Sequence, residues 1–388
     1  MINIPIYKMD GKKDGKQKYR IRINYQDSNG KNRQLDRVTY GFDEAKNLEL
    51  TLLHDLKNET KNSPLTLNEL FEEYISIKEH ELRKTSIAQT TKNFNHHILE
   101  PLGKIKIKNL NLQILQQWKI SIENKEKSNK EKLSLQTKKG IFTDLNTVLN
   151  YATNLEYIKS NPLKRIGTFK NTSILKKEMS YYTSEEFKKF ITCAKEYSIN
   201  AEKENNVYEW NYYVFFSIAF FTGLRKGEIH ALQWNDLDNN FNYLSVKRSI
   251  SQKLPGNDIE TPPKNTSSYR TLQLPKPLKK ILNEHFKRCK NIDGFLKTFK
   301  ICGGNKALRD TTIQKRNIYY SSIANVKTIR IHDFRHSHAS LLANNNINIQ
   351  EIARRLGHSK IEITWNTYSH LYPKEEERAI KVLNNIKI

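Results

Sequence analysis

The chain has 388 residues, with 66 Lys or Arg against 41 Asp or Glu, so its formal charge at pH 7 is +25. This length predicts two or three domains, and no apolar stretch approaches the ~20 residues that span a bilayer. The three cysteines are odd in number and widely spaced, which excludes a disulfide framework and a Cys-rich zinc module. We therefore expect a cytoplasmic protein without membrane contacts, whose excess charge reflects either a nucleic-acid partner or a lysine-rich proteome.

The first 60 residues have the pattern of a small sheet followed by a helix. Residues 19–25 alternate between apolar side chains and a basic face that includes Arg20 and Arg22, which predicts a strand. Further strands are expected over 2–9 and 32–40, with an Asn-Gly turn at 29–30 and helical spacing over 42–56. The basic face is either an ordinary solvated surface or a DNA-contacting one, and on the second interpretation Arg20 and Arg22 bind DNA.

Four helical patterns follow a linker at 61–64. The first begins at Thr66, which has capping-box spacing to Glu69, and the others cover 86–99, 112–122 and 135–155. We expect the second helix to stop before Pro101, and the charge-dense segment 125–132 to be an exposed loop. These patterns therefore predict an all-α domain over 65–162. It ends at Asn161-Pro162, and a basic connector follows.

A third domain begins near residue 180. Thr183 and Glu186 form another capping box, an apolar helix covers 210–221, strands are expected over 241–251 and 269–274, and the remainder is mainly helical. The predicted fold is multidomain. It comprises a small α+β sheet domain at 1–60, an all-α domain at 65–162, and a mainly α domain with a small β-sheet at 180–388.

Three short segments of this last domain contain residues suited to phosphate chemistry. Arg225 opens a helix directly after the apolar one, where a planar guanidinium and free backbone N–H groups favour an anion. His332 and Arg335 share a helix face because they are three residues apart. His358 follows Leu-Gly and precedes Tyr368 by ten residues. Each segment alone is a weak signal, whereas their order and spacing in a basic chain are specific.

Taken together, these segments resemble the tyrosine recombinases, the phage-integrase family of site-specific recombinases. The family places a Lys on a β-hairpin before the His-x-x-Arg box, and the segment 261–270 makes Lys264 the candidate, with Lys247 and Lys253 as nearby rivals. The resemblance implies that Tyr368 is the nucleophile of a six-residue catalytic set: Arg225, Lys264, His332, Arg335, His358 and Tyr368.

The resemblance also implies a reaction and its partners. The family forms a 3′-phosphotyrosyl intermediate without ATP or a metal cofactor, and a homotetramer exchanges strands between paired double-stranded DNA attachment sites. For this chain it implies a bacterial, DNA-associated integrase of a phage or integrative conjugative element. Residues 1–60 would bind arm-type DNA, 65–162 core-site DNA, and 180–388 would be catalytic. An excisionase and a DNA-bending host protein are further implied partners.

Three other interpretations remain. A host resolvase of chromosome dimers, or a relaxing topoisomerase, would use the same chemistry but typically lacks an arm-binding sheet. A non-catalytic DNA-binding regulator would not need the whole catalytic set. A metal site at His332, His336 and His338 is a minor alternative, because no carboxylate or Cys has matching spacing.

Overall fold

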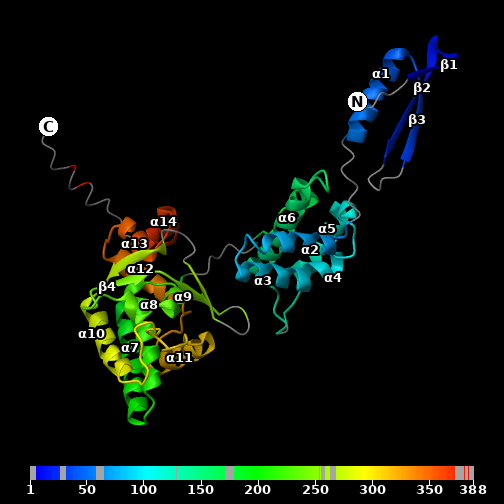
Figure 1. Ribbon diagram of the computed structural model, residues 1–388. Coiled ribbons are helices and arrows are strands. Elements are labelled where there is room, and N and C mark those ends of the chain that lie inside the picture. Colours follow the sequence, from blue (N-terminus) through cyan, green and yellow to red (C-terminus); the bar gives the residue numbers. More distant parts are fainter. Residues whose placement is uncertain are drawn as a thin grey trace. The chain divides into compact units, whose positions relative to one another are not determined.

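The computed structural model describes residues 6–26, 32–57, 65–127, 129–170, 179–252, 254, 258–262, 268–371, 380 and 383. The chain divides into two compact units, Met1–Ile174 and Leu175–Ile388 (Figure 1). Among the described residues, no helix combines the length and the apolar character that crossing a membrane requires.

The N-terminal part of the first unit is an antiparallel sheet covered on one face by a helix (Figure 1). The strands are β1 (Ile6–Lys13), β2 (Lys16–Gln26) and β3 (Asn32–Tyr40), in the order β1-β2-β3, and the helix is α1 (Phe42–Lys57). The predicted alternation explains this arrangement, because Ile21 and Ile23 are buried with Ala45 of α1 while Arg22 lies opposite Asp36 on the other face. Of the strand expected over 2–9, residues 6–9 belong to β1, which continues to Lys13, while residues 2–5 and the turn at 29–30 lie outside the described residues.

The rest of the first unit is helical, as expected. Its elements are α2 (Leu67–Lys78), α3 (Lys84–Asn93), the π-helical turn η1 (Phe94–Ile98), α4 (Leu99–Leu102), η2 (Ile107–Asn109), α5 (Leu112–Asn124), α6 (Leu135–Asn154) and η3 (Pro162–Arg165). The capping box at the start of α2 is present: the backbone N–H of Thr66 donates to Glu69 Oε2 at 2.7 Å, and that of Glu69 donates to Thr66 Oγ1 at 3.3 Å.

The prediction that a helix stops before Pro101 is wrong, because α4 contains this proline. Proline removes a backbone donor, which would leave the carbonyl four residues earlier without a partner. Here that carbonyl belongs to His97, and the indole N–H of Trp118 donates to it at 2.9 Å. The carbonyl of His96 likewise accepts from Lys125 Nζ at 2.7 Å. Side chains from and beside α5 therefore replace the bond that the proline cannot make.

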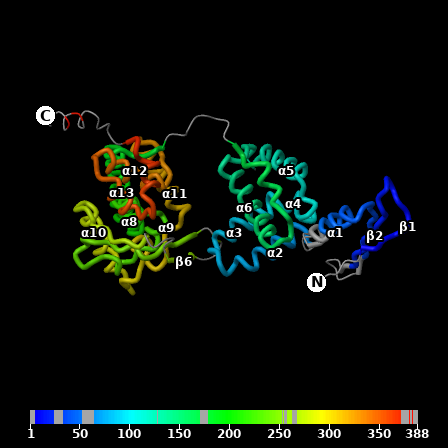
Figure 2. The backbone as a smooth tube through the Cα atoms, turned by 90° about the horizontal axis from the view of Figure 1, so that it is seen from above, coloured from blue at the N-terminus to red at the C-terminus, as the bar shows by residue number. Residues whose placement is uncertain are grey.

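The second unit is built around α8 (Trp210–Thr222), in which every residue from Trp210 to Phe220 is buried. Helices α7 (Ser184–Lys203), α10 (Lys276–Lys290) and α12 (Asp333–Asn344) pack against it, and α12 also contacts α13 (Ile349–Leu356). Figure 2 labels α8, α10, α12 and α13 in this unit. The other helices are η4 (Val207–Glu209), α9 (Lys226–Ala231), η5 (Trp234–Asp236), α11 (Asp310–Ile323), α14 (Ile361–Tyr368) and η7 (Ser369–Leu371).

Within the described residues, the strands of this unit form two separate two-stranded sheets. β4 (Tyr243–Val246) pairs with β7 (Arg270–Gln273), and β5 (Ser249–Ser251) pairs with β6 (Ile259–Thr261). The single strand expected over 241–251 is thus divided between the two sheets. The division falls at Lys247 and Arg248, whose side chains both form ion pairs with the buried carboxylate of Asp236.

Candidate active site

The junction between α8 and α9 positions Arg225. Helix α8 ends at Gly223, whose φ of +64° favours glycine, and a Cβ there would lie only 2.7 Å from Cδ2 of His338. Two residues later the guanidinium of Arg225 donates to Glu228 Oε1 at 2.9 Å and to the carbonyl oxygen of Gly357 at 3.2 Å. The close packing at Gly223 therefore fixes the point from which Arg225 extends.

Arg335 reaches the same place from α12. Its side chain is buried, with Nη1 donating to the carbonyl oxygen of Gly223 at 2.9 Å and Nη2 donating to Nε2 of His358 at 2.7 Å. Because Arg225 contacts Gly357 and Arg335 contacts His358, both guanidinium groups meet at the C-terminal end of α13. Three segments that are far apart in sequence thus converge, as predicted.

This convergence of cations is electrostatically unfavourable by itself. Burial, followed by the charge of Arg225, lowers the pKa of Arg335 to about 9. An anion bound between the two guanidinium groups would offset both effects, because it would add negative charge to that of Glu228, which is already paired with Arg225. The arrangement is therefore suited to a phosphate group.

The hydrogen bonds of His358 determine which nitrogen has the proton. Arginine can only donate, so Nε2 of His358 accepts from Arg335, and Nδ1–H donates to Thr364 Oγ1 at 2.7 Å. Burial, then Arg335 and Arg225, lower the pKa of His358 to about 4, so the ring is neutral at pH 7. Nε2 is therefore an acceptor in this arrangement, and donation to a phosphate from that atom requires the other tautomer.

The predicted nucleophile is the last residue of α14. Tyr368 is 2% exposed, and burial raises its pKa to about 12 despite the opposing charge of Arg335. Its hydroxyl makes a 2.6 Å hydrogen bond with Nδ1 of His336. His332 precedes α12, with its ring 5.1 Å from that of His336, and burial followed by the charge of His336 lowers its pKa to about 4. The direct partner of Tyr368 is therefore His336, to which the motif assigned no role.

A buried ion pair supports Arg225 from behind. Arg270 donates through Nη2 to Glu228 Oε2 at 2.8 Å, and their side chains are only 4% and 3% exposed. Although burial raises the pKa of Glu228, the bond and charge of Arg270, with the charge of Arg225, outweigh it and leave the pKa lowered. The alternation of Arg270 with Leu272 and Leu274 was the signal that this arginine faces inward, and it was missed.

Three predicted site residues remain. Lys264 lies outside the described residues, between β6 and β7. Arg20 and Arg22 are on the solvent-facing side of the N-terminal sheet, and both pair with Asp36. The hydrogen bond from Arg20, against the effect of burial, lowers the pKa of Asp36 to about 2, so this carboxylate stays charged and offsets part of the basic face.

The histidine cluster considered as a metal site is divided by its hydrogen bonds. Nδ1 of His338 donates to the carbonyl oxygen of Phe220 at 2.8 Å, whereas His336 contacts Tyr368. Within the described ranges, no three His, Cys, Asp or Glu side chains form a group that could hold a metal ion.

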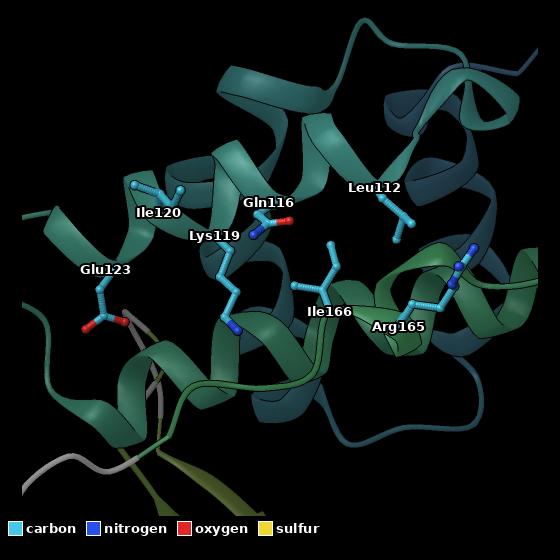
Figure 3. Close-up of a pocket in the computed structure, with 7 residues that line it drawn as sticks. All are labelled: Leu112, Gln116, Lys119, Ile120, Glu123, Arg165 and Ile166. Carbon is cyan, nitrogen blue, oxygen red and sulfur yellow. The ribbon is translucent and has the colours of Figure 1, made fainter.

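A cleft of about 390 Å³ lies in the helical part of the first unit (Figure 3). Helix α5 supplies most of its lining, and Arg165 and Ile166 complete it. Lys119 of α5 donates to the carbonyl oxygen of Gly167 at 2.9 Å, and Glu123 pairs with Lys138. None of the predicted catalytic residues that the structure describes lines this cleft, so we assign it no part in the chemistry.

Comparisons with protein families match this architecture. Residues 183–375 match the phage integrase family, and residues 66–120 match the phage integrase N-terminal SAM-like domain. The ICEBs1 integrase of Bacillus subtilis is 31% identical over 64% of this chain and 66% of that protein. A XerC-like tyrosine recombinase of Caldanaerobacter subterraneus is 30% identical over 66% of this chain and 67% of that protein.

Solved structures of low identity share the fold. A Tn1549 transposon integrase in complex with a circular intermediate DNA has a TM-score of 0.64 at 18% identity, covering 82% of this chain and 99% of the other. A lambda integrase tetramer bound to a Holliday junction has a TM-score of 0.51 at 17% identity, covering 92% and 95%. The chain therefore belongs to the phage integrase family of tyrosine recombinases, and is a site-specific integrase of the phage and integrative-conjugative-element type.

Proposed function

We propose that Tyr368 cuts and rejoins DNA at the attachment sites of a mobile element, so that the element is integrated and excised. The observation that supports this most strongly is the meeting of Arg225, Arg335 and His358 around one place, with Tyr368 on the adjoining helix. Two guanidinium groups at one position form a site for the non-bridging oxygens of a phosphodiester.

The proposed reaction keeps the energy of the phosphodiester in a covalent bond. Tyr368 Oη attacks phosphorus, the bond from phosphorus to the 5′ oxygen breaks, and Lys264 gives that oxygen a proton, so a 3′-phosphotyrosine and a free 5′-OH result. Charge that develops on the phosphate is offset by Arg225 and Arg335, while the neutral rings of His332 and of His358, the latter in the tautomer with its proton on Nε2, orient it. Attack by the 5′-OH of a partner duplex reverses these steps and releases Tyr368.

We further propose that the N-terminal sheet binds arm-type DNA, the helical part of the first unit binds core-site DNA, and a homotetramer performs strand exchange. The similarity to an integrase of a conjugative element favours a mobile element over a host resolvase, and the basic sheet face with Arg20 and Arg22 is consistent with an arm-binding role. The lambda integrase tetramer on a Holliday junction is the precedent for the assembly.

An apolar groove in the second unit is a candidate contact between subunits of this tetramer. It is lined by Phe220, Phe221 and Leu342, with the cations Lys276 and Arg355 among its residues. The sequence after Tyr368 contains three consecutive glutamates at 375–377, followed by several aliphatic residues. Lys374, Arg378, Lys381 and Lys387 outnumber these glutamates, so the aliphatic residues, rather than the net charge, are what complements an apolar groove.

The reaction is tested by trapping the covalent intermediate. The substrates are nicked duplexes from both ends of the element and from the junction of its circular form, so that a short 5′-OH fragment is lost after cleavage. Wild-type protein should form a stable protein–DNA adduct, Tyr368→Phe should form none, and Tyr243→Phe, which alters a tyrosine that is 49% exposed, should behave as wild type. Absence of an adduct on all three substrates would contradict the proposal.

The role of the N-terminal sheet is tested separately. Deletion of residues 1–60 should weaken recombination that depends on distant arm sites, while cleavage of an isolated core site remains measurable. Equal loss of both activities would show that the sheet has a structural role instead.

A further inference from the structure

His336 occupies a position that the family motif does not assign. In the described part of the chain, the hydrogen bond to Nδ1 of His336 is the only one made by the hydroxyl of Tyr368, and it is short, at 2.6 Å. Helix α12 also positions this ring one residue after Arg335 and one turn after His332, and α12 packs against α14. His336 thus contacts the attacking oxygen directly and follows, on the same helix, an arginine of the proposed phosphate site.

The protonation states on both sides of this bond fix its direction. The charged groups that face His336 are Asp333, Arg330 and Arg335, and its aromatic neighbours are His332 and Tyr368. Burial, against the charge of Asp333 and together with those of Arg330 and Arg335, lowers the pKa of His336, so the ring is neutral at pH 7 and offers a lone pair. Since the phenol remains protonated, Tyr368 donates and Nδ1 accepts.

We propose that His336 is the base that takes the proton of Tyr368 during strand cleavage. This inference rests on the proposed function, in which Tyr368 is the nucleophile. As Oη bonds to phosphorus, the electron pair of its O–H bond stays on oxygen and the proton moves to Nδ1. The bond to the 5′ oxygen breaks on the opposite side of phosphorus, and that oxygen receives its proton from a separate acid. In rejoining, Nδ1 returns the proton to Oη.

His332 is less well placed for this step. Among the described residues it makes no hydrogen bond with Tyr368, and its ring meets His336 edge to face. Its position beside Arg335 fits a role in orienting the phosphate. A general base must be within hydrogen-bonding reach of the proton that it removes, and that geometry belongs to His336.

The test compares His336→Asn and His336→Ala with wild type on the nicked substrate that wild type cleaves. Asparagine keeps a hydrogen-bond acceptor near the position of Nδ1 but is not a base, so it separates proton transfer from mere positioning. We expect both variants to form the adduct about 100-fold more slowly or worse at pH 7, the range typical of general-base loss. Thermal unfolding and core-site affinity should match wild type.

Two further measurements identify the step that is affected. On DNA with a bridging sulfur in place of the 5′ oxygen, the leaving group needs no proton, so Lys264→Met should recover while the His336 variants stay slow. The variants should also gain about tenfold in rate per pH unit from 7 to 9, because hydroxide must then ionise a phenol of high pKa.

The outcomes separate this inference from the proposed function. Adduct formation by wild type, abolished in Tyr368→Phe, establishes the nucleophile first. If His336→Asn then matches the wild-type rate, or if bridging sulfur restores it, His336 is not the base and the inference fails alone. Absence of any wild-type adduct would instead overturn both.

Discussion

Replacing Arg270 with Met removes one half of the buried ion pair behind Arg225. Both charged side chains are almost fully covered, at 4% and 3% exposure, so the carboxylate of Glu228 cannot turn to water when its partner is lost. Breaking such a pair from one side typically costs about 3–5 kcal/mol. Glu228 still contacts Arg225, whose side chain is 39% exposed, and we therefore expect a loss of about 2–3 kcal/mol in the free energy of unfolding.

The loss should depend on pH in a specific direction. In wild type the pKa of Glu228 is lowered, so its favourable contribution is complete above the unfolded pKa of about 4.3 and is lost as pH falls through the lower folded value. In Arg270→Met, the partner of Glu228 is gone, and burial raises the pKa of this carboxyl group. The buried charge therefore lowers the free energy of unfolding at neutral pH, and this loss shrinks as pH falls and Glu228 takes up a proton. The difference between the two proteins should therefore be largest near pH 7 and shrink toward pH 4.

Urea unfolding at several pH values measures this difference. Tryptophan fluorescence is a suitable signal, because most of the tryptophans belong to the second unit: Trp210, Trp234 and Trp365, against Trp118 in the first. The double variant Glu228→Gln/Arg270→Met should be more stable than Arg270→Met at pH 7, because it no longer buries an unpaired charge. A loss that is constant with pH, or a double variant that is no more stable, would refute the reasoning.

Three further predictions concern other parts of the chain. Asp36→Asn should free the two paired arginines of the sheet face, so that affinity for element-end DNA rises about three- to tenfold. The slope of log affinity against log salt concentration, measured by fluorescence anisotropy, should steepen by about one. An unchanged slope would contradict this. Gly223→Ala, whose Cβ would meet His338, should lower the free energy of unfolding by more than about 2 kcal/mol. Gly304→Ala, with φ +77° and open space at its Cβ, should lower it by only about 1 kcal/mol. Thermal unfolding measures both. Thr364→Val removes the acceptor of the Nδ1 proton of His358. It should slow adduct formation about tenfold while DNA affinity stays unchanged. An equal fall in DNA affinity would argue against a role of Thr364 in the chemistry.

The sequence predicted the elements whose signals are local. The alternation over 19–25 gave the central strand and its buried face, and the capping boxes at Thr66 and Thr183 marked the starts of α2 and α7 correctly. The proximity of Arg225, Arg335 and His358 was also predicted. The order and spacing of the family motif imply which residues come together in the fold, whereas helix and strand propensities do not.

What the sequence did not predict depends on contacts between distant segments. The helix continues through Pro101 because Trp118 supplies a donor from another helix, and no local pattern contains that information. The partnership of His336 with Tyr368 spans 32 residues and exists only because α12 and α14 pack together. In both cases tertiary packing, rather than propensity, decided the outcome.

The guanidinium groups of Arg225 and Arg335 are both anchored to main-chain oxygens, at Gly357 and at Gly223. A backbone carbonyl is the same whichever side chain its residue has, so point substitutions at neighbouring positions leave these anchors intact unless they shift a helix end. Substitutions near these positions should therefore displace the two guanidinium groups only when they move Gly223 or Gly357, the glycines at which α8 and α13 end.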